Sequence, residues 1–81
     1  MKRLLRQQID QLDHKIRDLL VERFRLAQQV MLLKQQSGEP KTDEMREQQI
    51  LDSVTRDLPA DLQPLIRAVF EIILSEGKNL V

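Results

Sequence analysis

At 81 residues the chain forms one domain, residues 1–81, and a chain this short can bury only about 60% of its unfolded surface, so association with a partner would stabilise it. Its 13 basic and 13 acidic residues cancel, which excludes a global basic field for binding nucleic acid or an anionic membrane. Cysteine is absent, which excludes disulfides and thiolate metal sites, and neither a signal peptide nor a run of about 18 apolar residues is visible, so we expect a cytoplasmic protein.

The first 33 residues carry apolar side chains at the alternating spacing of a heptad repeat. These residues, called the apolar ladder below, are Leu5, Ile9, Leu12, Ile16, Leu19, Leu26, Val30 and Leu33. The ladder predicts a helix over about residues 2–36 that ends at Ser37-Gly38-Glu39-Pro40. At about 1.5 Å per residue this helix measures roughly 50 Å, too long for the rest of the chain to cover, so a second copy is the natural cover.

An arginine, Arg23, occupies the position where the ladder should have its ninth apolar residue. The spacing directs Arg23 into the packed face, and because a buried cation without a counter-charge is unfavourable, we expect an anionic group to meet it. Lys34 follows eleven residues later, nearly three turns along the same face. The pattern alone is equally compatible with ion pairs between helices, so it leaves the role of these two cations open.

A second helix is predicted after the glycine-proline turn. Thr42 or Asp43 can cap its N-terminus, and it ends near Asp57. Its apolar positions Leu51, Val54 and Leu58 share a face with Asp43 and Glu47. Two carboxylates on an apolar face are unusual, and they are the natural partners for the cations of the first helix.

A third helix is predicted after the turn at Pro59. Asp61 can cap it, and it runs towards Gly77 or the end of the chain. The apolar residues expected to face inward are Leu62, Leu65, Ile66, Val69, Phe70, Ile73 and Leu74. With no strand pattern or repeat in the sequence, the predicted fold is all-α.

Several kinds of site are excluded by the residues that they require. His14, the single histidine, lies between Asp13 and Lys15 on the charged flank of the first helix, so we expect it to be solvated and no metal to be bound. The serines lack a histidine relay, and the two glycines form no phosphate-binding loop. Two phenylalanines make no base-stacking platform. Nucleophilic catalysis, nucleotide binding and nucleic-acid binding are therefore disfavoured.

Three segments carry charged residues at a distinctive spacing, namely residues 5–13 (LRQQIDQLD), 22–30 (ERFRLAQQV) and 38–47 (GEPKTDEMRE), with Lys34 between the last two. In these segments the chain resembles the all-α class of chorismate mutases, most densely up to Leu51. The resemblance implies an intertwined homodimer of three-helix chains with a long first helix. It also implies an isomerase of the shikimate pathway and aromatic amino acid biosynthesis, which rearranges the dianion chorismate to prephenate without a cofactor.

The resemblance also implies roles for individual residues. Lys34 would donate to the ether oxygen of chorismate, Arg23 would hold a carboxylate, and Glu47 would hold the ring hydroxyl. The implied substrate-binding residues are Arg6, Asp43, Arg46, Gly77 and Val81. Arg6 lies 17 residues before Arg23, about 25 Å along one helix, which is too far to share a small ligand within one chain. We therefore expect Arg6 to act in trans, on the site of the partner protomer.

The chain departs from the family at Gly77 and Val81, where a small polar residue and, one turn later, a glutamine or glutamate are usual. Losing one donor to the ether oxygen lowers the rate on the order of a hundredfold to a thousandfold, so we expect weak activity. Three explanations are open: the alignment slips across residues 58–63 so that Lys78 or Asn79 takes over, the sequence ends early, or the chain has lost activity or was designed without the full site.

Two other functions remain open. An isochorismate-pyruvate lyase shares the implied fold and basic pocket and acts on a related dianion, so the motifs of the first helix do not separate it from a mutase. A non-catalytic helical dimerisation or regulatory module would instead use Arg23 and Lys34 in structural ion pairs. Release of pyruvate would identify the lyase, and failure to bind a mimic of the bicyclic transition state would favour the module.

Overall fold

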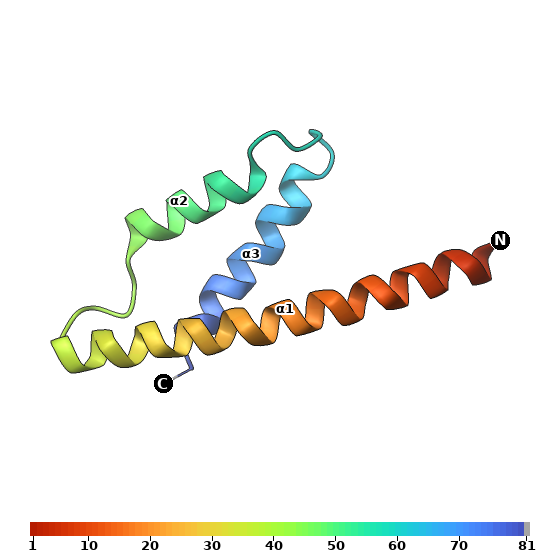
Figure 1. Ribbon diagram of the computed structural model, residues 1–81. Coiled ribbons are helices and arrows are strands. Elements are labelled where there is room, and N and C mark those ends of the chain that lie inside the picture. Colours follow the sequence, from red (N-terminus) through yellow and green to blue (C-terminus); the bar gives the residue numbers. More distant parts are fainter. Residues whose placement is uncertain (81) are drawn as a thin grey trace.

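The computed structural model describes residues 1–80, which form three helices (Figure 1). These are α1 (Lys2–Ser37), α2 (Glu44–Thr55) and α3 (Gln63–Gly77), and none of the 80 residues belongs to a strand. The predicted all-α fold of three helices with a long first helix is therefore confirmed. None of the helices is long and apolar enough to cross a membrane within this part of the chain.

Helix α1 ends at the glycine that the sequence indicates. Gly38 adopts a left-handed conformation with φ 76°, and its N–H donates to the carbonyl oxygen of Lys34. A side chain would be strained at this φ, which is why a glycine stops the helix here. The last helical residue is Ser37, one residue beyond the predicted end.

Helix α2 begins after Asp43, which settles the choice between the two predicted caps. The Asp43 carboxylate accepts a hydrogen bond of 3.0 Å from the backbone N–H of Arg46, the usual geometry of an N-cap. The helix ends at Thr55, two residues before the predicted end. Asp57 has a φ of 62°, a left-handed conformation that cannot continue a right-handed helix.

Helix α3 begins at Gln63 without a side-chain cap, so the predicted cap at Asp61 is wrong. Pro64 lies in the first turn, where its fixed φ favours helix and its missing N–H leaves no donor unsatisfied. The backbone N–H groups of Leu62 and Gln63 both donate to the carbonyl oxygen of Pro59, so the turn itself supplies the acceptor.

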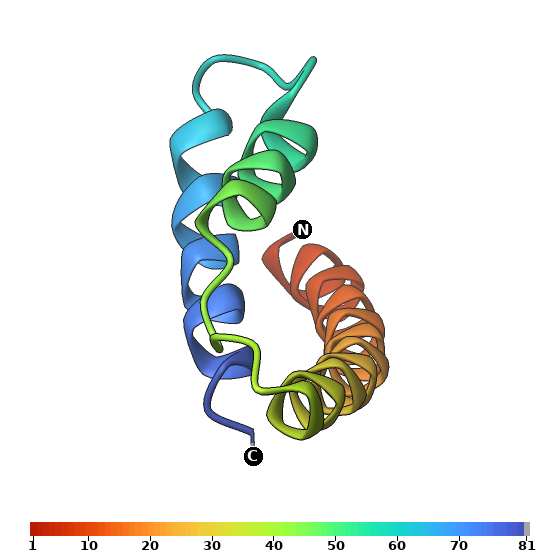
Figure 2. The ribbon, with the colours of Figure 1, turned by 90° about the vertical axis from the view of Figure 1, so that its left-hand side faces the viewer.

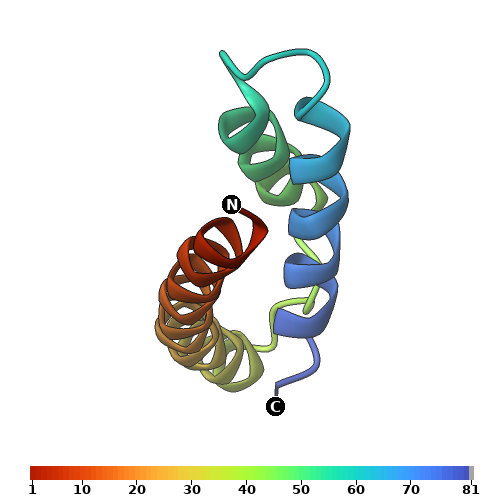
Figure 3. The same cartoon turned by 90° about the vertical axis from the view of Figure 1, so that its right-hand side faces the viewer.

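Within residues 1–80, α2 and α3 pack together as a hairpin, and α3 is the helix of this hairpin that packs against α1 (Figure 1). Figures 2 and 3 show α3 running beside α2 and reaching α1 at its C-terminal end. The buried apolar residues are Met31 from α1, Leu51 from α2 and Ile73 from α3. Of the apolar residues predicted to face inward on α3, Ile66, Phe70 and Leu74 are half-buried, but Leu62, Leu65 and Val69 are exposed within the single chain.

The N-terminal half of α1 is left uncovered by the rest of residues 1–80. Every residue from 1 to 19 is exposed, and the eight residues of the apolar ladder are between 48% and 64% exposed. The molecule is correspondingly elongated, measuring 54 × 26 × 15 Å. A row of aliphatic side chains of this length in contact with water is the surface that a partner helix would cover.

Candidate functional site

The main pocket lies where the C-terminal half of α1, the loop before α2, the start of α2 and the end of α3 meet. Its volume is about 310 Å³, within the size range of small-molecule sites. Its apolar wall is formed by Leu26, Ala27, Val30, Met31, Ile50 and Leu74. Its charged residues are Arg23, Lys34, Lys41, Asp43, Arg46, Glu47 and Lys78. The pocket therefore combines an apolar wall with convergent charges, which is the usual make-up of a ligand site.

Most residues predicted from the sequence for the site come together in this pocket. Those that line it are Arg23, Lys34, Asp43, Arg46, Glu47 and Gly77. Arg6 does not line it and is exposed near the start of α1. Val81 lies outside the described residues. The single chain thus assembles one part of the predicted site and leaves Arg6 apart from it.

The two cations from α1 are half-buried, whereas the apolar ladder on the same helix is exposed. Lys34 donates from Nζ to the backbone carbonyl oxygen of Lys41 at 3.4 Å. Neither Arg23 nor Lys34 forms an ion pair with a carboxylate of residues 1–80. Within the described chain, the anionic partner expected for Arg23 is therefore not a protein carboxylate.

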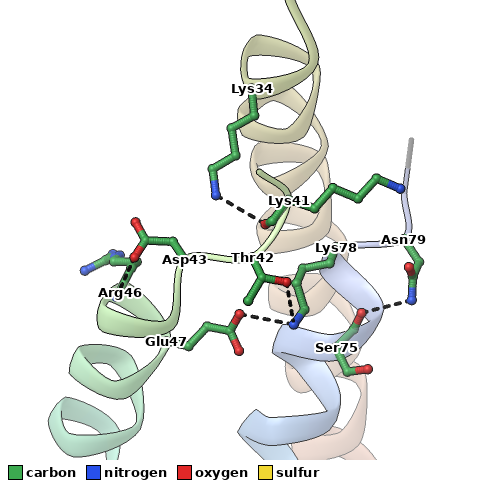
Figure 4. Close-up of polar contacts among 9 residues, drawn as sticks. All are labelled: Lys34, Lys41, Thr42, Asp43, Arg46, Glu47, Ser75, Lys78 and Asn79. Carbon is green, nitrogen blue, oxygen red and sulfur yellow. Dashed lines mark hydrogen bonds and ion pairs between the residues drawn. The ribbon is translucent and has the colours of Figure 1, made fainter. Parts of the chain in front are cut away.

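Glu47 holds a different cation, Lys78 (Figure 4). The Lys78 Nζ lies 3.1 Å from Oε2 of Glu47, and the two side chains are 28% and 27% exposed. The same ammonium donates to the Thr42 hydroxyl at 3.5 Å. Lys78 thereby connects the end of α3 to the loop and to α2, and the pair closes one side of the pocket.

Asp43 and Arg46 stand at the entrance to α2, and both are exposed. One oxygen of the Asp43 carboxylate is engaged in capping the helix through the Arg46 N–H. In Figure 4 the guanidinium of Arg46 extends away from the Glu47–Lys78 pair. The arrangement gives Asp43 a structural role in addition to its place at the pocket.

Gly77, the last residue of α3, is buried and lines the pocket through its backbone alone. It lies against Ala27, whose Cβ would be 3.7 Å from a Cβ added at Gly77. This is an ordinary van der Waals distance, so the crossing of α1 and α3 has room for a small side chain at this position.

The charge of the pocket favours an anionic ligand. Five cationic side chains and two carboxylates line it, which leaves a formal excess of three positive charges. Lysine ammonium and arginine guanidinium groups donate hydrogen bonds to carboxylates, and an apolar wall strengthens such contacts by excluding water. No three His, Cys, Asp or Glu side chains gather as metal ligands within residues 1–80. The arrangement can thus bind a small polyanion and stabilise negative charge that develops on it.

Lys41 lines the pocket but was given no role in the site from the sequence. Thr42 was predicted only as a possible cap of the second helix, and its hydroxyl instead accepts a hydrogen bond from Lys78. Lys78 itself was predicted only as one residue, with Asn79, that could take over if the alignment at Gly77 and Val81 slips. Its position in the sequence could have identified Lys78, because it directly follows the last residue of α3. From there its long side chain reaches the start of α2.

A comparison with protein families finds one described as chorismate mutase type II, which matches residues 5–81. Comparisons with curated proteins and with solved structures give no match. The matched region contains Arg6 and every residue that lines the pocket.

Proposed function

Because the chain belongs to the chorismate mutase type II family, we propose that it is a chorismate mutase, an isomerase that rearranges chorismate to prephenate in this pocket. The observation that carries the proposal is the convergence of Arg23, Lys34 and Glu47 on one pocket with an excess of positive charge. We assign the activity to a single domain, residues 1–81.

The reaction suits a site made of cations. Chorismate carries two carboxylates, and its pericyclic rearrangement needs no proton transfer, so a protein accelerates it by holding the reactive conformer and by stabilising negative charge on the breaking ether oxygen. The pocket offers donors for both tasks and requires no nucleophile. Its apolar wall would strengthen the electrostatic contacts where bound substrate and a partner protomer displace water from it, because charges interact more strongly away from water.

Individual roles follow from the chemistry of the side chains. Arg23 has a planar guanidinium that can bind a carboxylate through two parallel hydrogen bonds, and no carboxylate of residues 1–80 occupies it. Lys34 offers a compact charge suited to a single ether oxygen. Glu47 uses Oε2 for Lys78, which leaves Oε1 to accept a hydrogen bond from the ring hydroxyl.

The proposal includes a homodimer. The chain exposes 6847 Å², whereas a compact monomer of 9.6 kDa exposes about 5,100 Å². Its radius of gyration of 15.5 Å likewise exceeds the value of about 12 Å that compact chains of this length have. The excess area of about 1,700 Å² is more than twice what one partner contributes to a standard interface. A second copy packed along the apolar ladder would cover it.

In such a dimer Arg6 would complete the pocket of the partner protomer. Arg6 and Arg23 lie on one continuous helix, about 25 Å apart along its axis, so they cannot hold the same small ligand within a chain. Two long helices that pack in opposite directions bring the start of one beside the later half of the other. Asp43 and Arg46, at the entrance to α2, would complete the rim of the pocket.

The test is direct turnover. Purified protein is mixed with chorismate, and loss of the ultraviolet band of the substrate is followed together with identification of the product. Lys34→Ala is run in parallel, because a contaminating enzyme would be unaffected by it, and Lys15→Ala serves as a control for loss of an exposed lysine on the same helix. We expect prephenate from the parent and from Lys15→Ala, and a loss on the order of a hundredfold to a thousandfold for Lys34→Ala.

Other outcomes would reject the proposal. Release of pyruvate from isochorismate, without turnover of chorismate, would identify a lyase. Absence of turnover on both substrates, together with no binding of a dicarboxylate mimic of the bicyclic transition state, would identify a non-catalytic helical module.

A further inference from the structure

Lys78 differs from a surface lysine because it is half-buried and contacts two other segments of the chain. It follows the last residue of α3, is half-buried, and extends from that end towards the first turn of α2 (Figure 4). Its ammonium contacts Glu47 on α2 and Thr42 in the preceding loop. It therefore lies among three of the segments that form the pocket, and its side chain is part of the pocket wall.

The hydrogen-bonding capacity of Lys78 is not exhausted by these contacts. An ammonium group has three N–H donors. Lys78 donates one of them to the Thr42 hydroxyl at 3.5 Å and forms an ion pair with Glu47 at 3.1 Å, so at most two of its donors are engaged. One donor therefore remains for a ligand without loss of the Glu47 contact. Among residues 1–80, the ammonium of Lys34 on α1 makes a single contact, at 3.4 Å with a backbone carbonyl, and it also retains donors.

The charges of the pocket also favour a contact between Lys78 and an anionic ligand. Glu47 neutralises one lysine, but Arg23 and Lys34 have no carboxylate partner within residues 1–80. A dianion has two carboxylates, and these can interact with cations on different sides of the pocket. On the α1 side of the pocket the cations are Arg23 and Lys34. On the α3 side, Gly77 has no side chain, so Lys78 supplies the cation.

We propose that Lys78 is a substrate-binding residue, which donates its remaining N–H to an anionic oxygen of the dianion from the α3 side of the pocket. This inference rests on the proposed function. Lys78 would supply the polar contact that Gly77 cannot supply, while Glu47 and Thr42 hold its ammonium in place. The alternative is that Lys78 serves only to tie α3 to α2.

The first experiment replaces Lys78 by methionine, which keeps the length of the apolar stem and removes the charge. We expect kcat/KM for chorismate to fall on the order of a hundredfold, while the midpoint of thermal unfolding falls only slightly because the lost ion pair is partly exposed. The matched control is Arg67→Met. Like Lys78, Arg67 is a cation paired with a glutamate, because it contacts Glu71 at 3.4 Å, but it does not line the pocket. We expect the control to retain the activity of the parent. A Lys78→Met protein within about twofold of the parent would overturn the proposal.

A double-mutant cycle separates contact with substrate from an effect through Glu47. If Lys78 acted only by positioning Glu47, Lys78→Met would have no further effect in a Glu47→Gln background. If Lys78 contacts the substrate, Lys78→Met should still lower kcat/KM clearly in the Glu47→Gln background, although by a different factor, because two residues in contact at 3.1 Å are energetically coupled. If Lys78→Met fails to fold, Lys78→Gln replaces it, because glutamine keeps an N–H donor at this position without the charge. The same loss is expected.

Binding of the dicarboxylate transition-state mimic, measured by calorimetry, distinguishes failure of this inference from failure of the proposed function. Turnover by the parent with no change in affinity for the mimic in Lys78→Met would overturn the inference alone. Binding by the parent without turnover, weakened on the order of a hundredfold in Lys78→Met, would support the inference and reject the mutase. Neither turnover nor binding by the parent would overturn both.

Discussion

Gly77 of α3 lies against Ala27 of α1, so closely that a Cβ added at Gly77 would be 3.7 Å from the Ala27 Cβ. Ala27 is one turn after Arg23 and about two turns before Lys34, so this contact brings the end of α3 to the part of α1 that carries both cations. Two small residues allow the close approach, and Lys78 follows immediately. The crossing of α1 and α3 therefore positions the pocket.

Gly77→Ser should fold and raise activity. The added Cβ meets Ala27 at an ordinary contact distance, and replacing a helical glycine stabilises the folded protein by about 0.5 kcal/mol. The hydroxyl adds a polar group to the pocket wall, and one hydrogen bond to the substrate corresponds to a gain of about two- to tenfold in kcat/KM. Gly77→Ala separates the two effects, because it should match the stability of Gly77→Ser but not its activity. A clear loss of thermal stability in both variants would show that the crossing tolerates no side chain.

Arg23→Leu should exchange activity for stability. Leucine restores the interrupted ladder and removes a half-buried cation that has no carboxylate partner within residues 1–80, so we expect the free energy of unfolding to rise by about 1–2 kcal/mol. Loss of the carboxylate contact should lower kcat/KM on the order of a thousandfold. Urea unfolding and turnover of chorismate check the two halves. An unfolded Arg23→Leu protein would instead make Arg23 a structural residue.

The sequence was sufficient to predict the three helices and six of the residues that line the pocket. Apolar spacing, Gly38 and Asp43 locate α1 and the start of α2 because periodicity and capping are local properties. The start of α3 was less accurate, since Asp61 resembles a cap but Pro64 and the carbonyl oxygen of Pro59 determine where the helix begins.

The contacts between segments distant in sequence could not be predicted in the same way. Lys78 and Glu47 are 31 residues apart, and their ion pair depends on how α3 returns beside α2. Likewise, spacing placed Leu65 and Val69 inward on α3, but a pattern shows only which residues share a face and not which neighbour covers that face. Both are exposed in the single chain, where no helix covers them within residues 1–80.

Charges introduced into the apolar ladder should separate the protomers. Ile9→Glu combined with Ile16→Glu places two carboxylates on the exposed apolar face of α1, where like charges from two copies would meet. We expect a monomer by analytical ultracentrifugation and a loss of activity of at least about a hundredfold, since Arg6, the residue that we propose the partner contributes to the pocket, is a charged donor. His14→Glu, on the charged flank of the same helix, should remain dimeric and active. A fully active monomer would contradict the shared site.

Mixing two inactive variants tests whether Arg6 acts in trans. Arg6→Ala and Lys34→Ala are each expected to lose most activity as homodimers. When they are unfolded together and refolded at equal concentrations, half of the dimers contain one chain of each kind. In those dimers one pocket combines the intact Lys34 of one chain with the intact Arg6 of the other, and the second pocket lacks both. The mixture should therefore recover about one quarter of the parent's activity, as expected for random pairing in a symmetric dimer with two shared sites. If Arg6 acted within its own chain, every pocket would lack one of the two cations, and refolding the mixture would recover nothing.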